Sequence, residues 1–162
     1  MTFESDLVAL LPRLRRFARS LASQPADADD LCQAALERAL KSRDQWEPGT
    51  RLDSWMYRIT RNLWIDTTRA AGRKGPHDTI DDAVLQVADS SHAAIEAHME
   101  LNDVDRAMNR LPGEQREAIA LVLVEGLAYK EAAAVLDIPM GTLTSRLVRG
   151  REALMRELGE AA

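Results

Sequence analysis

Hydroxyl and arginine side chains gather near the C-terminus in a pattern suited to binding nucleic acid. The set comprises Thr142, Thr144, Ser145, Arg146 and Arg149. A guanidinium fork can bind the edge of guanine in the major groove, whereas hydroxyls and the amides at a helix N-terminus can hold phosphates. An amphipathic helix with a solvated arginine face contains the same residue types, so this set alone leaves both interpretations open.

Two helices joined by a short turn must position these side chains. Apolar residues recur at helical spacing over about 129–136 and again over about 142–158, and Asp137 to Gly141 separates the two segments. The packing positions are Ala132, Ala133, Val135 and Leu136 in the first segment and Leu143, Leu147 and Leu154 in the second. This arrangement is typical of a helix-turn-helix motif, whose second helix enters the major groove of DNA.

The distribution of charge argues against tight DNA binding by the chain alone. The formal net charge is −5. The segment from Arg51 to Lys74 nevertheless has six basic and two acidic residues, and the segment from Gly141 to Arg156 has four basic and one acidic. Because non-specific DNA affinity arises mainly from the neutralisation of phosphates, we expect the isolated chain to bind DNA weakly and to need another protein.

Catalytic and metal-binding sites are not predicted. His77, His92 and His98 match no zinc-binding spacing with the single Cys32. The sequence has no glycine-rich phosphate loop, and its paired carboxylates, such as Asp29–Asp30, fall at a helix start or in a polar tract. We therefore expect no enzyme, no metal and no cofactor.

The sequence also predicts a cytoplasmic protein without membrane insertion. No stretch approaches the roughly 18 to 20 apolar residues that a membrane span requires, and Met1 to Leu11 lacks the basic flank of a signal peptide. Cys32 lies among apolar helical residues, which favours a buried thiol over a redox sensor.

Helical periodicity divides the chain into an all-α pair of small domains. Residues 7–21 predict a first helix, Asp27 is the expected N-cap of a second helix that runs to about Lys41, and a loop from Arg43 to Thr50 precedes a third helix. Gly72 to Pro76 ends that helix. We expect a first domain over 1–72, a flexible acidic linker over 73–93, and a second domain over 94–162 in which helices resume near Ala94.

The second domain resembles the fourth conserved region of sigma-70-type factors. The matching residues are Leu111-Pro112, Arg116, Glu125-Gly126-Leu127, Tyr129, Glu131, Asp137 to Leu143, Ser145-Arg146-Leu147, Arg149 and Arg151. The resemblance implies that Thr142, Thr144, Ser145, Arg146 and Arg149 bind the −35 promoter element. Gly150 departs from the family, which usually has alanine there, and a glycine inside a helix costs on the order of 1 kcal/mol.

The first domain is similar to the second conserved region of the same family. The likeness rests on Ala28 to Gln33, on Trp55 to Ile59, and on Arg61, Asn62 and Asp66. It implies that core RNA polymerase is bound by Asp30, Gln33 and Glu37. It also implies that the −10 element is bound by Arg58, Arg61, Asn62 and Arg69, with arginines along the phosphates and the Asn62 amide at a base edge.

The whole chain is thus identified as a member of the extracytoplasmic-function subfamily of sigma factors, which act in stress responses. The resemblance implies promoter DNA and core polymerase as partners, and commonly an anti-sigma factor. Trp46, Trp64 and Tyr57 are candidates for stacking on unpaired bases, although core packing is the favoured role for most of them, and Trp55, on the apolar stripe, is assigned to packing.

Two other classes of protein stay open on the residues alone. A helix-turn-helix repressor or activator that binds DNA without polymerase would explain 142–151 but not the first domain. An enzyme with an appended DNA-binding domain would need a catalytic constellation, which the sequence does not provide.

Overall fold

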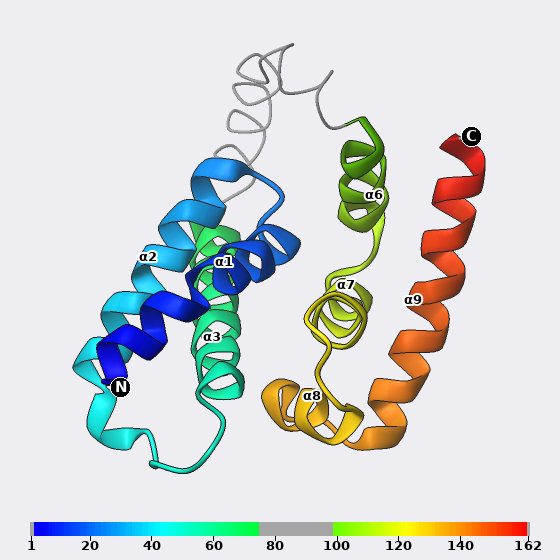
Figure 1. Cartoon of the computed structure of the whole chain (residues 1–162). Coiled ribbons are helices and arrows are strands. Elements are labelled where there is room, and N and C mark those ends of the chain that lie inside the picture. The colour runs from blue at the N-terminus through cyan, green and yellow to red at the C-terminus, as the bar shows by residue number, and fades with distance from the viewer. Residues whose placement is uncertain (1, 75–98, 162) are drawn as a thin grey trace.

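The computed structural model describes the backbone of residues 2–74 and 99–161, and side chains over 2–70 and 103–159. Every regular element in these ranges is helical, which confirms the expected all-α fold of two helical domains. The N-terminal and C-terminal helices form two groups that lie against each other (Figure 1). The third helix continues through residues 73 and 74, the first two of the expected linker, whereas the rest of that linker and the resumption of helix near Ala94 fall outside the described residues.

Three helices form the N-terminal domain: α1 (Phe3–Leu21), α2 (Pro25–Lys41) and α3 (Leu52–Lys74), with a 3-10 turn, η1 (Arg43–Gln45), between the last two. A capping box at Thr2 begins α1: its side chain accepts from the Ser5 amide, and the Ser5 side chain accepts in return. The core forms where the apolar stripes meet. Phe17 of α1 contacts Tyr57 of α3 edge-on at 5.0 Å between ring centroids.

The expected N-cap of α2 was wrong by one turn. Gln24 occupies the N-cap, and Pro25 is the first helical residue. Proline suits that position because its fixed φ is helical and the amide proton it lacks would have no partner within the helix. Asp27 instead lies in the first turn, where a carboxylate favours the positive end of the helix dipole.

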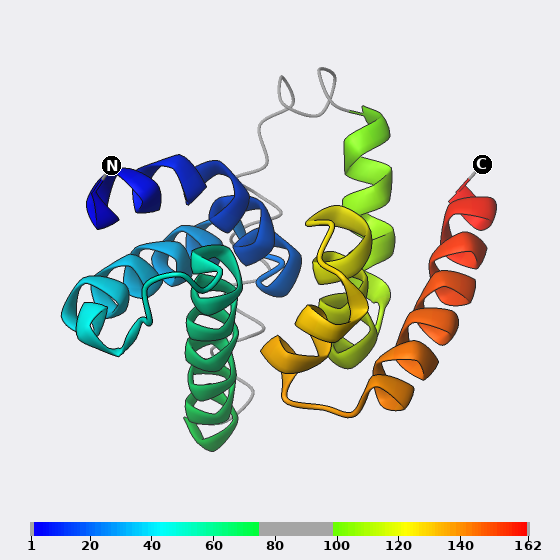
Figure 2. The ribbon, with the colours of Figure 1, turned by 60° about the horizontal axis from the view of Figure 1, so that its bottom comes forward.

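The C-terminal domain comprises α6 (Met99–Arg110), α7 (Gly113–Ile119), a π-helical turn η2 (Ala120–Val124), α8 (Tyr129–Leu136) and α9 (Met140–Ala161). The turn between α8 and α9 places Asp137 in the left-handed region at φ 56°. There, the Ile138 amide donates to the carbonyl of Ala133. This hydrogen bond closes the short turn of the predicted helix-turn-helix. Figures 1 and 2 both show that turn at one end of the C-terminal domain.

Gly150 lies where α9 crosses α7. A Cβ at this position would stand 2.7 Å from Cδ1 of Ile119 and 3.2 Å from Cβ of Gln115. Only a hydrogen fits between the two helices, so glycine permits their close approach. Glycine therefore has two opposing effects on stability here: it lowers helix propensity, as the sequence predicted, and it permits the close packing of α9 on α7.

We expect Gly150→Ala to lower the free energy of unfolding by about 1–2 kcal/mol, because overpacking outweighs the gain in helix propensity. Urea unfolding of the full chain measures this. Gly159→Ala is the matched control, since no atom lies within 4 Å of its added Cβ, and it should be neutral or stabilising. Adding Ile119→Val to Gly150→Ala removes Cδ1 from residue 119 and should recover part of the lost stability. A stabilised Gly150→Ala variant would contradict the packing argument.

Candidate DNA and polymerase interfaces

The first three turns of α9 bring the predicted −35 residues together. Thr144, Ser145 and Arg149 are exposed, and Thr142 is half-buried. The Thr144 hydroxyl donates to the carbonyl of Met140 at 2.9 Å, which leaves its oxygen lone pairs available to a further donor. Because α8 and the short turn fix the start of α9, these side chains project from one end of a supported helix.

Arg146 and Arg149 differ in their surroundings although the sequence treats them alike. The side chain of Arg146 is only 23% exposed, and its Nη2 lies 3.8 Å from the Glu114 carboxylate of α7. Arg149 is exposed. Arg149 is therefore the better placed of the two to enter a groove, whereas Arg146 is held near the body of the domain.

Sequence reasoning missed an apolar member of this surface. Val148 is 52% exposed, and it follows Thr144 by four residues and Ser145 by three, so the three share a face. A methyl-bearing side chain between hydroxyls suits the C5-methyl group of thymine. The helical spacing could have revealed it, since Val148 falls outside the stripe formed by Leu143, Leu147 and Leu154.

The predicted polymerase-binding residues form one exposed line on α2. Asp30, Gln33 and Glu37 are all exposed, and their spacings of three and four residues place them on one face. We call this line the α2 stripe. Helix α2 packs on α1 and α3 and lies on the side of the N-terminal domain away from α7, α8 and α9 in both ribbon views (Figures 1 and 2).

The predicted −10 residues lie along α3, but the structure divides them. Asn62 and Arg69 are exposed. The guanidinium of Arg61 donates to the Glu117 carboxylate at 3.2 and 3.4 Å, and the exposed Arg58 donates to the carbonyl oxygen of Ala134 at 2.6 Å. Two of the four residues are thus engaged by the C-terminal domain.

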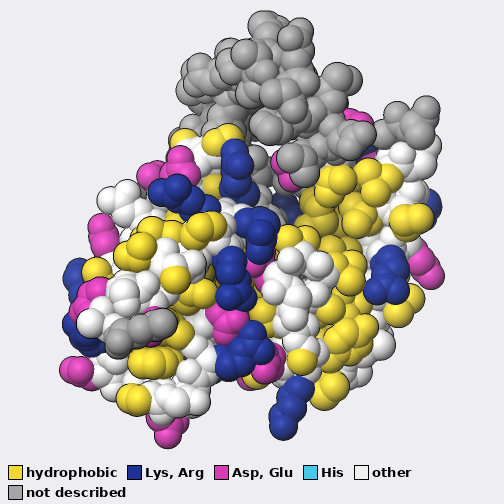
Figure 3. All heavy atoms as spheres, in the orientation of Figure 1, with side chains coloured by type: hydrophobic (Ala, Val, Ile, Leu, Met, Phe, Trp, Pro, Cys, Tyr) yellow, Lys and Arg dark blue, Asp and Glu magenta, His cyan; other side chains and the backbone are white. Residues whose placement is uncertain are grey.

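These contacts belong to an interface between the two domains, which we call the seam. On the N-terminal side it contains Arg16, Arg51, Tyr57, Arg58 and Arg61, and on the C-terminal side Glu117, Glu125, Glu131 and Ala134. Figure 3 shows Lys and Arg side chains in a file down the middle of this face, between the two groups of helices. Acidic groups of the C-terminal domain therefore meet basic groups of the N-terminal domain.

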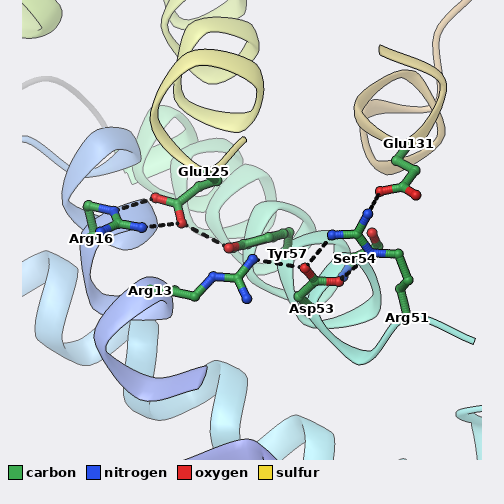
Figure 4. Close-up of polar contacts among 8 residues, drawn as sticks. All are labelled: Arg13, Arg16, Arg51, Asp53, Ser54, Tyr57, Glu125 and Glu131. Atoms are coloured by element: carbon green, nitrogen blue, oxygen red, sulfur yellow. Dashed lines mark hydrogen bonds and ion pairs between the residues drawn. The ribbon is translucent and has the colours of Figure 1, made fainter. Parts of the chain in front are cut away.

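Asp53, at the start of α3, binds two arginines, Arg13 and Arg51 (Figure 4). It accepts from Arg13 at 2.8 Å and from Arg51 at 3.0 and 2.7 Å, and Arg51 also donates to Glu131. Burial raises the pKa of Asp53, but the hydrogen bonds from Arg51 and Arg13 outweigh it and hold this pKa below its ordinary value. The carboxylate is therefore charged at neutral pH and fixes Arg51 beside α8.

Glu125 is the most deeply buried acid of the seam. Its side chain is 0% exposed and accepts two bonds from Arg16, at 2.8 and 2.9 Å, and one from the Tyr57 hydroxyl at 2.9 Å. Burial, and then the bond to Glu125, raise the pKa of Tyr57 well above its ordinary value. The phenol therefore stays protonated and remains a donor (Figure 4).

The aromatic candidates for base stacking are mostly engaged in packing. Tyr57 is fully buried. Phe3 contacts Trp46 at 5.7 Å and Trp55 at 6.1 Å between ring centroids, and Trp64 is half-buried against the core. Within this structure the rings of the N-terminal domain hold its helices together.

The part of the chain that the structure describes contains no group of three His, Cys, Asp or Glu residues able to hold a metal ion. None of its helices is long and apolar enough to span a membrane. Cys32 is buried, and burial raises the pKa of its thiol, so the described environment is that of a packed side chain. His77, His92 and His98 lie outside the described residues.

Comparison with known proteins accounts for both domains. Residues 7–74 match the family model of sigma-70 region 2, and residues 101–154 match that of sigma-70 region 4. The chain is 37% identical to the ECF RNA polymerase sigma factor EcfG of Rhodopseudomonas palustris over 94% of this chain and 83% of that protein. It is 31% identical to the ECF sigma-E factor of Escherichia coli over 90% and 82%, respectively.

Two solved structures share the arrangement of helices. The sigma factor RpoE of Bartonella quintana, solved in complex with the anti-sigma factor NepR, superposes with a TM-score of 0.81 at 34% identity, covering 97% of this chain and 96% of that one. CnrH, solved with the cytosolic domain of CnrY, gives a TM-score of 0.70 at 26% identity over 98% and 91%.

With its region 2 and region 4 helices in place, the chain belongs to the sigma-70 family, within the extracytoplasmic-function group. It is a transcription initiation factor that recognises promoters for RNA polymerase.

We expect Arg149→Ala to weaken promoter binding by roughly 1–3 kcal/mol and to relax preference at one −35 position if Arg149 reads a base. Arg146→Ala should have a smaller effect, because its side chain is only 23% exposed and lies beside Glu114. Binding of reconstituted holoenzyme to duplexes randomised in the −35 element measures both. The exposed Arg156, about two turns beyond Arg149 on α9, supplies the matched control in Arg156→Ala. Equal losses for Arg146 and Arg149 would refute the distinction drawn from their burial.

Proposed function

We propose that three separate surfaces of this chain divide the work of initiation. Core polymerase binds the α2 stripe of Asp30, Gln33 and Glu37. The −10 surface of α3 consists of Arg58, Arg61, Asn62 and Arg69, and the −35 surface of α9 consists of Thr142, Thr144, Ser145, Arg146 and Arg149. We further propose the functional boundaries 1–72, 73–93 and 94–162 for the first domain, the linker and the second domain.

The observation that supports this division is the separation of the surfaces. The α2 stripe is exposed on a helix that packs on α1 and α3, whereas the −35 residues extend from the start of α9 in the other domain. A factor that is bound by polymerase and DNA at the same time needs surfaces that do not compete. The α2 stripe meets that requirement with respect to both proposed DNA surfaces.

The proposed mechanism of melting requires no catalytic residue. Unpairing and unstacking a base costs a few kcal/mol, and hydrogen bonds and stacking in a protein pocket can offset that cost. Asn62 is exposed on α3 one turn after Arg58 and has both a donor and an acceptor for a base edge. Capture of unpaired bases would then hold the bubble open without hydrolysis.

The proposed setting is the cytoplasm, with an anti-sigma factor as regulator. RpoE of Bartonella quintana was solved in complex with the anti-sigma factor NepR, and CnrH was solved with the cytosolic domain of CnrY. This chain shares their fold over nearly its whole length, which supports the same class of partner here.

Addition of the purified chain to core polymerase on a defined promoter tests the function as a whole. We expect specific initiation only when both are present, and weak, salt-sensitive binding of duplex DNA by the chain alone, since its net charge is −5. Tight, specific duplex binding without polymerase would instead support a stand-alone repressor or activator.

We expect Asn62→Ala to impair open-complex formation on duplex promoter much more than on a template whose −10 region is already mismatched. The reason is that the amide would stabilise bases only after they unpair. Permanganate footprinting of unpaired thymines measures opening on both templates, and affinity for core polymerase should stay unchanged. Asp66→Ala, at an exposed residue one turn further along α3, serves as the control. Equal defects on both templates would show that Asn62 does not act in opening.

A further inference from the structure

The carboxylate of Glu125 ties the two domains together. It comes from the end of η2 in the C-terminal domain, whereas the groups that donate to it, the Arg16 guanidinium and the Tyr57 hydroxyl, come from α1 and α3. A charge removed from water is tolerated only when it is paired and hydrogen-bonded. The buried carboxylate of Glu125 finds these donors only while the two domains are docked (Figure 4). Undocking would return it to water.

The docked domain engages Arg58 and Arg61 of the proposed −10 surface through oxygen acceptors and leaves Asn62 and Arg69 exposed. Glu117 accepts from Arg61, the Ala134 carbonyl accepts from Arg58, and Glu131 accepts from Arg51. A pocket of about 320 Å³ beside the start of α3 is lined by Thr50, Trp55 and Arg58, and α8 forms its other wall. Oxygen acceptors of this chain thus occupy the arginines that nucleic acid would need.

The docked arrangement and simultaneous binding of both promoter elements exclude each other. Elements named −10 and −35 lie about 25 base pairs apart, or roughly 85 Å along a duplex that rises about 34 Å per ten base pairs. A compact chain of this length has a radius of gyration of about 15 Å. The domains must therefore separate to reach both elements.

We propose that Arg16, Tyr57 and Glu125 form an intramolecular latch that holds the free factor closed, with the acidic face of its C-terminal domain masking the −10 surface of α3. The identity of the masked surface rests on the function proposed above, whereas the latch itself does not. The α2 stripe stays exposed in the closed form, so core polymerase can bind before the latch opens. A partner that binds only the open form draws the equilibrium toward it.

The latch can be tested by whether one mutation, Arg16→Ala, raises or lowers the affinity for DNA. In the full chain, Arg16→Ala removes a positive charge, which on electrostatic grounds alone should weaken binding to DNA. If the latch exists, the variant opens and binds a labelled single-stranded 20-nucleotide DNA of mixed sequence about tenfold more tightly, because masking lowers the binding-competent fraction. Its radius of gyration in small-angle X-ray scattering should also rise.

Two further variants complete the test. Tyr57→Phe keeps both the charge and the ring contact with Phe17 but removes a donor to Glu125, so it should change both measurements in the same direction by a smaller amount. Arg19→Ala alters an exposed arginine on the same helix and should leave the radius of gyration unchanged while slightly weakening DNA binding. Circular dichroism confirms that each variant keeps its helices.

Three outcomes would overturn the proposal or part of it. An unchanged radius of gyration in Arg16→Ala refutes the latch. A larger radius with unchanged or weaker DNA binding refutes the masking of the −10 surface. A wild-type chain that is already as extended as the variant refutes both. None of these measurements uses polymerase, so failure to initiate transcription in reconstitution would count against the proposed function and not against the latch.

Discussion

The burial of Glu125 constrains how the two halves of this protein meet. Removing a carboxylate from water costs several kcal/mol unless charged donors compensate, and the bonds from Arg16 and Tyr57 reach it from the other domain. Only the carboxylate of this pair is buried, since the Arg16 side chain is 51% exposed, but loss of Arg16 would leave the buried carboxylate without its charged partner, which is costly. The pair therefore selects one docking geometry over others, since a rotated domain would leave Glu125 without these donors.

The same geometry explains how an acidic protein can carry two basic surfaces. Arg51, Arg58 and Arg61 lie on the seam, and each is engaged by an acceptor of the C-terminal domain. In the closed form much of the positive charge of α3 is neutralised within the chain. The weak DNA binding that we expect of the free factor would thus have a structural cause beyond its net charge, because Glu117 and Glu131 of the C-terminal domain pair with Arg61 and Arg51.

Local sequence patterns predicted the elements well, because helical periodicity and turn residues are local properties. The helix-turn-helix and the helix containing Leu52 to Leu63 follow from spacing alone, whereas the line of Asp30, Gln33 and Glu37 was inferred from the family resemblance. Asp27 was assigned the wrong role because Pro25 is a stronger start signal. The role of Gly150 depends on Ile119 and Gln115 of another helix, and no propensity scale contains that information.

The seam was beyond sequence reasoning for a related reason. Arg16 and Glu125 are 109 residues apart, and on α1 Arg16 has the spacing expected of a solvated arginine. Its role emerges only when the tertiary arrangement places a buried carboxylate opposite. The predicted −10 residues show the converse, since Arg58 and Arg61 were correctly placed on one helix, but their engagement by Ala134 and Glu117 could not be anticipated.

The α2 stripe stays accessible in the closed arrangement, and this sets the order in which the proposed partners bind. A factor whose DNA surface was open when free would occupy promoters without polymerase and so block them. Masking α3 while leaving Asp30, Gln33 and Glu37 exposed makes polymerase the first partner and DNA the second. The shared fold with RpoE of Bartonella quintana, which was solved in complex with an anti-sigma factor and superposes over 97% of this chain, includes both domains together. An inhibitor that binds such an arrangement needs only to stabilise a state that the chain's own Arg16–Glu125 ion pair already favours.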